Sequence, residues 1–145
     1  NQYLISKDLN KIIKNKKIDF IKSYHSINLI KNEKFDFVNF GSSLQYLNDC
    51  EKILKILFKK SKKFFYISAT SFYFKKNFKS KIVVKQVNLL PSILHCYIFN
   101  FFFIKKIFEE SKFKVISKSK NSFKKINFKN FNIKILHLNI LFKKN

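Results

Sequence analysis

Three histidines and two cysteines are the side chains best suited to proton transfer, nucleophilic attack or metal binding. They are His25, His95, His137, Cys50 and Cys96. The histidines are far apart and show no paired metal-ligand spacing, so we expect no metal site. The spacing supports no Ser-His-Asp or Cys-His arrangement either. His95 is the one candidate for proton transfer, because a histidine can act as a general base near neutral pH.

The apolar segment around His95 leaves two interpretations open. His95 lies two residues before Tyr97, in what we predict to be the loop before a helix that begins at residue 101. A lone histidine in such a loop is more often a packing residue than a catalytic one. The two cysteines are predicted to be free thiols, which are typical of a reducing compartment, and we expect a cytoplasmic protein.

A strand, a loop of small residues and a helix make up the stretch FDFVNFGSSLQYLNDCEKILKIL. Residues 35–40 form a short apolar run rich in strand formers, and the run stops at Gly41, the only glycine in the chain. Asn48, with Glu51 three positions further on, is typical of a capping box that opens a helix. In open α/β sheets ligands bind outside the carboxyl ends of the strands, so we expect residues 41–46 to contact a ligand.

This stretch resembles the fourth strand and the following helix of class I S-adenosylmethionine-dependent methyltransferases. More narrowly, it resembles a family of methyltransferases with unsettled acceptors that is associated with bacterial surface-polysaccharide gene clusters. FFYISAT resembles the next strand of that family, and VVKQVN and a closing ILHLNILF follow in the same order. The resemblance covers nearly the whole chain. It implies an α/β fold with a Rossmann-like class I methyltransferase sheet.

The resemblance also implies a cofactor, S-adenosylmethionine, and a small-molecule acceptor, for which the family's associations suggest a sugar or glycan precursor. The cofactor side would contain Gly41, Ser42, Ser43, Leu44, Ser23 and Tyr24. The acceptor side would contain Gln45, Tyr46, Thr70, Gln86 and Tyr97, with His95 as the general base. Thr70 is the one residue retained from the family's Asp-Arg-Thr-Pro-like strand end. The acidic residue often found near the position of Ser23 and Tyr24 is missing.

Two parts of the family's cofactor site are absent from the sequence. They are the glycine-rich loop after the first strand and the acidic residue that holds the ribose hydroxyls. No G-x-G occurs, and Gly41 follows the wrong strand to supply it. We therefore interpret residues 1–145 as one domain, the C-terminal part of a methyltransferase whose N-terminal strands lie upstream. Alone, the chain is expected to be insoluble or non-cooperative and to bind no S-adenosylmethionine. An alternative is a catalytically inactive methyltransferase-like binding or scaffold fragment.

A second alternative, a basic nucleic-acid-binding module, comes from the net charge of +23. Lys, Asn, Ile and Phe make up 87 of the 145 residues, and all four have A/T-rich codons. We therefore attribute the charge mainly to codon drift. The chain contains no Arg, the residue that makes bidentate phosphate and base contacts, so we expect no specific nucleic-acid partner. The sequence does not predict the oligomeric state.

The periodicity of apolar residues predicts the remaining elements. Helices are expected at 6–15, 49–58 and 101–110; the second has an apolar stripe at Cys50, Ile53, Leu54, Leu57 and Phe58, and the third has Asn100 as its N-cap and a stripe at Phe101, Ile104, Ile107 and Phe108. Strands are expected at 18–21, 35–40, 64–69, 115–116 and 133–142, with 35–40 buried and His137 packed within the last strand, which inserts antiparallel in the resembled fold. Residues 82–87 are expected to be extended, and lysine-rich loops are expected at 75–81 and 118–130. Lys112 stands where relatives place a C-capping glycine. Residues 89–104 are apolar, but they are too few and include Pro91, His95 and Asn100, so no membrane span is predicted.

Overall fold

The computed structural model describes residues 33–89, 92–120 and 133–145. The chain divides into two compact units, Asn1–Glu33 and Lys34–Asn145, and all the described strands and helices belong to the second. The helix predicted at 6–15, the strand predicted at 18–21, and the candidate residues Ser23 and Tyr24 lie outside the described residues.

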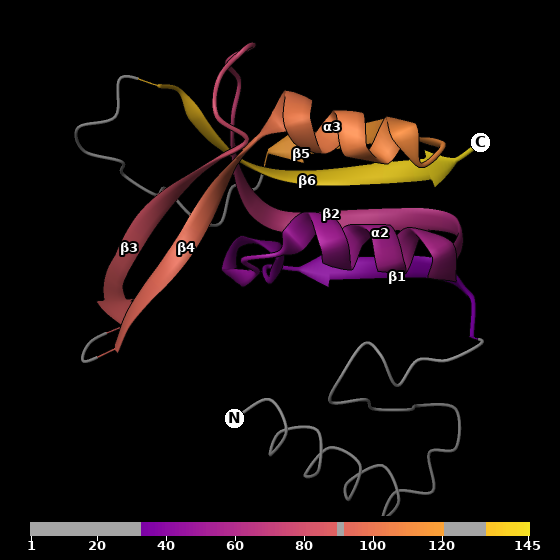
Figure 1. The fold of residues 1–145 in the computed structure, drawn as a ribbon, viewed down its shortest axis with the longest axis horizontal. Helices are drawn as coiled ribbons and strands as arrows, with labels where there is room; N and C mark the ends of the chain where they lie inside the picture. The colour runs from indigo at the N-terminus through magenta and orange to yellow at the C-terminus, as the bar shows by residue number, and fades with distance from the viewer. Residues whose placement is uncertain (1–32, 90–91, 121–132) are drawn as a thin grey trace, which may run out of the picture. The chain divides into compact units, whose positions relative to one another are not determined.

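The described residues of this unit form six strands and two α-helices in an α/β fold (Figure 1). In chain order the elements are β1 (Phe35–Gly41), the 3-10 helix η2 (Leu44–Tyr46), α2 (Cys50–Lys60), β2 (Ser61–Tyr73), β3 (Lys81–Leu89), β4 (Ser92–Asn100), α3 (Phe101–Glu110), β5 (Phe113–Lys120) and β6 (Ile135–Lys144). Each element predicted from residue 35 onward is present, although several bounds differ.

The sheet is organised around β2, the longest strand. β6 pairs antiparallel along one edge of β2 and lies between β2 and β5, as expected for a closing strand that inserts antiparallel. On the other edge, β1 pairs parallel with residues 61–68 of β2, and β4 then pairs parallel with Phe72 and Tyr73. β3 and β4 pair antiparallel as a hairpin, which extends from the carboxyl end of β2 (Figure 1). The hairpin therefore lies at the end of the sheet where a ligand is expected.

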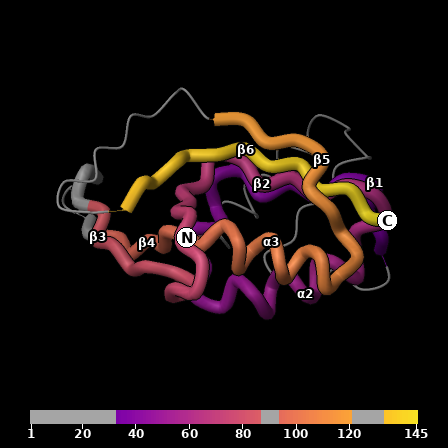
Figure 2. The backbone as a smooth tube through the Cα atoms, turned by 90° about the horizontal axis from the view of Figure 1, so that it is seen from above, coloured from indigo at the N-terminus to yellow at the C-terminus, as the bar shows by residue number. Residues whose placement is uncertain are grey.

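One face of the sheet is covered by α2 and α3, which lie side by side in Figure 2. Their buried residues follow the predicted stripes: Cys50, Leu54, Leu57 and Phe58 on α2, and Phe101, Ile104, Ile107 and Phe108 on α3. Phe108 connects the helices to the sheet. Its ring stacks on that of Phe142 on β6, with 3.7 Å between the ring centroids, and meets the ring of Phe58 on α2 edge-on, with 4.6 Å between the centroids. Burying each large apolar side chain is worth about 1.5–3 kcal/mol, so this aromatic cluster holds the unit together.

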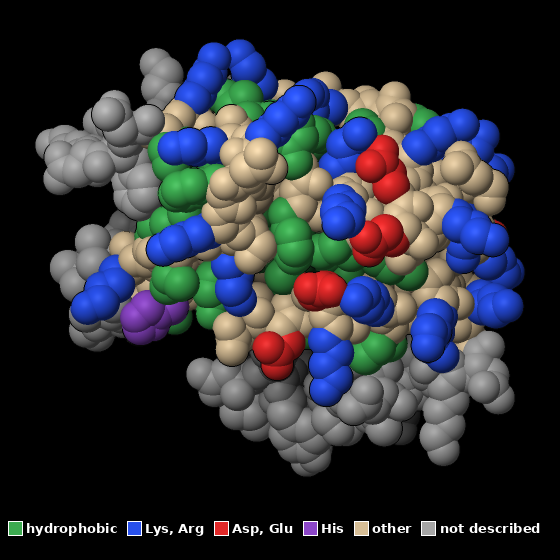
Figure 3. Space-filling view, turned by 45° about the horizontal axis from the view of Figure 1, so that its top comes forward, with side chains coloured by type: hydrophobic (Ala, Val, Ile, Leu, Met, Phe, Trp, Pro, Cys, Tyr) green, Lys and Arg blue, Asp and Glu red, His purple; other side chains and the backbone are tan. Residues whose placement is uncertain are grey.

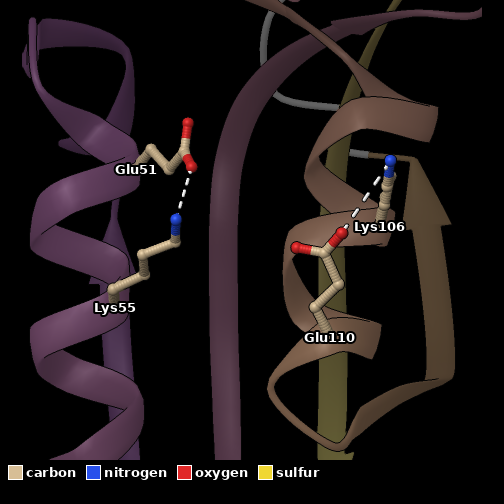
Figure 4. Close-up of polar contacts among 4 residues, drawn as sticks. All are labelled: Glu51, Lys55, Lys106 and Glu110. Atoms are coloured by element: carbon tan, nitrogen blue, oxygen red, sulfur yellow. Dashed lines mark hydrogen bonds and ion pairs between the residues drawn. The ribbon is translucent and has the colours of Figure 1, made fainter.

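Surface ion pairs contribute little beside this packing. Glu51 pairs with Lys55 at 2.7 Å on α2, and Lys106 pairs with Glu110 at 3.8 Å on α3 (Figure 4). Exposed i,i+4 pairs of this kind are worth about 0.3–0.5 kcal/mol each. The helices are therefore stabilised mainly by their apolar faces.

The helix ends agree with the sequence at α3 and differ at α2. Asn100 caps α3 as predicted, since its Oδ1 accepts a hydrogen bond from the Phe102 N–H at 3.1 Å. Lys112, in place of glycine, adopts the left-handed conformation with φ 65°. The predicted capping box is wrong, because the N-cap of α2 is Asp49 and makes no side-chain cap bond. The Asn48 side chain instead accepts from the Tyr97 hydroxyl.

Three further expectations need correction. The segment around His95 is strand β4 rather than a loop. β5 extends to Lys120, so residues 118–120 belong to a strand and not to the predicted basic loop, whose remainder lies outside the described residues. β1 is not fully buried, because Phe37 is 52% exposed and, within the described residues, β1 pairs with β2 alone. No helix in the described part of the chain is long and apolar enough to cross a bilayer.

Candidate functional site

The loop after β1 is fixed to β2 by a hydrogen bond and is exposed to solvent at its first three residues. The Ser42 N–H donates to the Ser68 carbonyl at 3.1 Å, which ties the loop to β2, and Leu44 is fully buried. Ser42 adopts φ 52°, a left-handed conformation that turns the chain sharply after the strand. Gly41, Ser42 and Ser43 are exposed. The loop therefore presents small residues at the carboxyl end of β1, where a ligand was predicted.

Gln45 carries an unusual polar atom in this loop. Its Oε1 is buried and, in the described structure, has no hydrogen-bond partner. A buried acceptor without a partner costs about 1–3 kcal/mol, and such atoms are rare in native proteins. Because the atom is closed off from solvent, an N–H or O–H group of a ligand could reach it only after a shift of the loop.

Hydrogen bonds join the loop to the β3–β4 hairpin at two points. The Tyr46 hydroxyl donates to Gln86 Oε1 at 2.9 Å. The Tyr97 hydroxyl donates to Asn48 Oδ1 at 2.8 Å, and Lys81 Nζ donates to the Asn48 carbonyl at 2.7 Å. The structure thus brings together Tyr46, Gln86 and Tyr97, which the sequence placed on the acceptor side. It adds Asn48 and Lys81, which sequence reasoning missed because Asn48 was assigned to a helix cap and Lys81 to a lysine-rich loop.

His95 lies on this hairpin and is exposed. Its cross-strand partner is Lys85, and Val83 pairs with Tyr97 in the same register. Because directly opposed residues and those two positions apart share a face, His95, Lys85 and Tyr97 project on one side of the hairpin. His95 is accessible to a bound acceptor.

Thr70 lies at a bulge in β2 and faces the protein interior. It is fully buried, and its hydroxyl donates to the Ser68 carbonyl at 3.2 Å. The bulge is built by Ala69, which has φ 49° and whose N–H donates to Asn139 Oδ1 at 2.9 Å. Bulges re-aim a strand near functional sites. In this geometry Thr70 shapes the end of β2 and does not present its hydroxyl to solvent.

A second polar pair follows the bulge. Ser71 Oγ lies 3.1 Å from His137 Nδ1, and the two residues are direct cross-strand partners. Sequence reasoning expected His137 to pack within a strand, and it does lie on β6. Among the described residues, no three His, Cys, Asp or Glu side chains come together in a way that could hold a metal ion.

A cavity of about 660 Å³ lies beside the loop, outside α2. Its lining includes Asn48, Cys50, Lys55, Lys81 and Phe103, and none of residues 41–46. Burial raises the pKa of the Cys50 thiol, and the nearby Lys81 ammonium opposes that shift only in part. Cys50 is therefore held as a neutral thiol and is poorly suited to nucleophilic attack. The hydrogen-bonded loop and hairpin, rather than this cavity, carry the predicted residues.

Comparison with known proteins finds similar structures but no similar sequence among protein-family models and curated proteins. No protein-family model matches the chain, and no curated protein is detectably similar in sequence. A S-adenosylmethionine-dependent methyltransferase from Clostridium acetobutylicum has a TM-score of 0.59 at 16% identity, covering 100% of this chain and 72% of that one. The N-terminal domain of EvdMO1, crystallised in the presence of SAH and D-fucose, has a TM-score of 0.63 at 9% identity, and the match covers 97% of this chain and 62% of that one. Magnesium protoporphyrin IX methyltransferase from Synechocystis, with bound SAM, has a TM-score of 0.53 at 11% identity, and the match covers 91% of this chain and 51% of that one.

The fold is that of class I methyltransferases. At identities of 9–16% the likeness establishes the fold alone. The chain spans between 51% and 72% of the length of these three structures. Within the class I methyltransferase fold, β1 and β2 are the predicted fourth and fifth strands, and β5 and β6 are the closing antiparallel pair.

Proposed function

We propose that these residues form one wall of the cofactor site and most of the acceptor side of a S-adenosylmethionine-dependent methyltransferase. The observation that carries the proposal is the unpartnered Oε1 of Gln45, in an open loop at the carboxyl end of β1. This edge of an α/β sheet is where ligands bind. The protein would be cytoplasmic, in keeping with the two free thiols.

The residues of the loop fit a cofactor of this size and polarity. Gly41, Ser42 and Ser43 are exposed and small, and Gln45 Oε1 close by in the same loop is an acceptor without a hydrogen-bond partner in the described structure. When bound, S-adenosylmethionine supplies an electrophilic methyl group. The protein's part is to align that group with the acceptor and to exclude water, which together account for much of the acceleration in reactions that bring two reactants together.

The hairpin would hold the acceptor. Gln86 and Tyr46 form a hydrogen-bonded pair at its rim, and Tyr97 is fixed by Asn48. His95 is exposed on the same strand as Tyr97 and could accept a proton from an acceptor hydroxyl as the methyl group transfers. A sugar or glycan precursor, which offers such hydroxyls, is the acceptor class that we propose.

The alternative is a catalytically inactive fragment that binds or supports a partner. The sequence favours it at one point, since the 145 residues contain no G-x-G loop. The two proposals differ in one measurable property, the binding of S-adenosylmethionine by the complete natural protein that contains these residues.

Substitution of Gly41 by Val tests the cofactor wall. A Cβ at position 41 would meet Asn39 Nδ2 at 3.6 Å and Ser68 Oγ at 3.7 Å, which are ordinary contacts, so the fold should tolerate the change. The added methyl groups enlarge the side chain at the exposed carboxyl end of β1. We expect Gly41→Val to weaken S-adenosylmethionine binding about tenfold or more in calorimetry, equivalent to about 1.4 kcal/mol.

Gly41→Ala is the matched control, with a smaller loss of affinity and an unchanged thermal midpoint. Gln45→Leu removes the unpartnered oxygen while retaining the bulk of the side chain, and it should weaken binding without loss of stability. Equal affinities for the natural protein, Gly41→Val and Gln45→Leu would exclude this loop from the cofactor site.

A further inference from the structure

The pairing of β3 with β4 gathers positive groups on one face of the hairpin. Lys81 is opposite Phe99, Val83 is opposite Tyr97, and Lys85 is opposite His95. These positions alternate with Ile82 and Val84, which project on the other face. We call the first surface the lysine face and define it by Lys81, Lys85, His95 and Tyr97.

Lys81 is held in place on this face without a carboxylate. Its Nζ donates to the Asn48 carbonyl at 2.7 Å and to Asn48 Oδ1 at 3.3 Å, and it lies 4.1 Å from the centre of the Tyr97 ring. All three partners are neutral. Their contacts fix the position of the ammonium group, and among the described residues it forms no ion pair with a carboxylate, so it is a preorganised cation.

Acidic groups are sparse around the lysine face. No Asp or Glu occurs between Lys52 and Phe108, a span that contains the whole hairpin and the loop before it. Two acids line the same cavity as Lys81 at the start of α2, where Asp49 follows Asn48 and Glu51 is engaged by Lys55. Figure 3 shows lysines over the whole of the visible face, with the few acidic side chains lying among them near the middle of the view.

We propose that the lysine face binds a phosphate or carboxylate group of a small-molecule acceptor. Lys81 and Lys85 supply the positive charge, and the exposed His95 supplies a hydrogen-bonding group beside them, while Tyr97 holds Lys81 in place through its ring. Lysine is a point-charge ligand for phosphate, which suits a small anion that approaches from solvent. The word acceptor rests on the proposed methyltransferase function, because Tyr46 and Asn48 connect this hairpin to the proposed cofactor loop.

A nucleic acid fits the surface less well. The chain contains no Arg for bidentate phosphate contacts, and the fixed cation is confined to a single hairpin face. Non-specific attraction of any polyanion to the total charge would instead involve lysines all over the surface and would fall steeply with salt.

The test is a titration of the complete natural protein with inorganic pyrophosphate at physiological salt, followed by calorimetry and without S-adenosylmethionine. Lys85→Gln removes one charge from the lysine face, and the described structure gives the Lys85 side chain no hydrogen bond or ion pair whose loss could unfold the hairpin. We expect it to weaken binding about tenfold, and Lys81→Gln to do at least as much. Lys62→Gln, an exposed lysine near the start of β2, is the charge-matched control and should change affinity less than twofold.

Equal weakening by Lys85→Gln and Lys62→Gln would overturn the proposal, because it would mean that total charge alone binds the anion. Binding of a DNA duplex or of phosphatidylglycerol vesicles that is tighter than that of pyrophosphate, and unaffected by Lys85→Gln, would overturn it too. Binding of S-adenosylmethionine is measured separately on Lys85→Gln and should be unchanged. Failure of the cofactor proposal and failure of the anion proposal are therefore distinguishable.

Discussion

Truncation of Phe108 is the most direct test of how this unit is held together. Phe108 is fully buried on α3, and its ring contacts those of Phe58, Phe65, Phe113 and Phe142. Phe→Ala changes in cores cost about 3–5 kcal/mol, and each aromatic pair adds about 0.5–1.5 kcal/mol beyond burial. With four ring partners, we expect Phe108→Ala to cost about 5 kcal/mol, which is comparable to the whole stability of a marginal domain.

The assay is urea unfolding of the complete natural protein, followed by circular dichroism. With a urea dependence of about 2 kcal/mol per molar, the midpoint should fall by about 2.5 M, or the variant should be unfolded without denaturant. Phe102→Ala is the matched control on the same helix, where the side chain is 38% exposed and the expected cost is about 1 kcal/mol or less. If Phe108→Ala lowered the midpoint no more than Phe102→Ala, the aromatic cluster would not be the main source of stability.

Two other predictions follow from burial and pairing. The 145-residue chain expressed alone should aggregate or melt without a sharp transition, because β1 offers an unpaired edge among the described residues and Phe37 is 52% exposed. The substitution Phe37→Lys should raise the soluble fraction. A soluble monomer with a sharp thermal transition would contradict this prediction. Burial raises the pKa of the Cys50 thiol above 9.0 and that of the Tyr73 phenol above 10.0, so the unfolded chain loses these protons first as pH rises. Stability should therefore be complete below about pH 8 and fall above about pH 9, and Cys50→Ala should make the thermal midpoint less dependent on pH there; a midpoint that stays constant to pH 10.5 would refute the assignment.

Patterns within single elements were predictable from the sequence. The apolar stripes of α2 and α3, the cap at Asn100 and the alternation in β6 depend on residues a few positions apart, and the structure confirms them. The strand β4 was missed because its apolar run continues directly into α3, with only Asn100 between them and no Gly or Pro to mark the junction. The end of β5 was missed because Lys118 and Lys120 are exposed and polar, although the backbone pairs with β6.

Contacts between distant segments were less predictable. Asn48 resembles a helix cap by its local sequence, but its side chain is used 49 positions away by Tyr97. No local pattern could reveal that the Asn48 carbonyl also fixes Lys81, or that Gln45 Oε1 is left without a partner. The family resemblance predicts Tyr46, Gln86 and Tyr97 on the acceptor side; in the structure Tyr46 bonds to Gln86, and Tyr97 bonds to Asn48.

The scarcity of glycine has a consequence for how this protein could be repaired or could evolve. Ser42, Ala69, Asn77 and Lys112 all occupy left-handed backbone conformations. A residue with a Cβ costs about 1–2 kcal/mol more than glycine in that conformation, with asparagine the least penalised. The positive φ of Ala69 and of Lys112 therefore each lowers the free energy of unfolding slightly, and substitution by glycine would remove that cost. Ala69→Gly and Lys112→Gly should therefore each raise the thermal midpoint of the protein without changing its contacts.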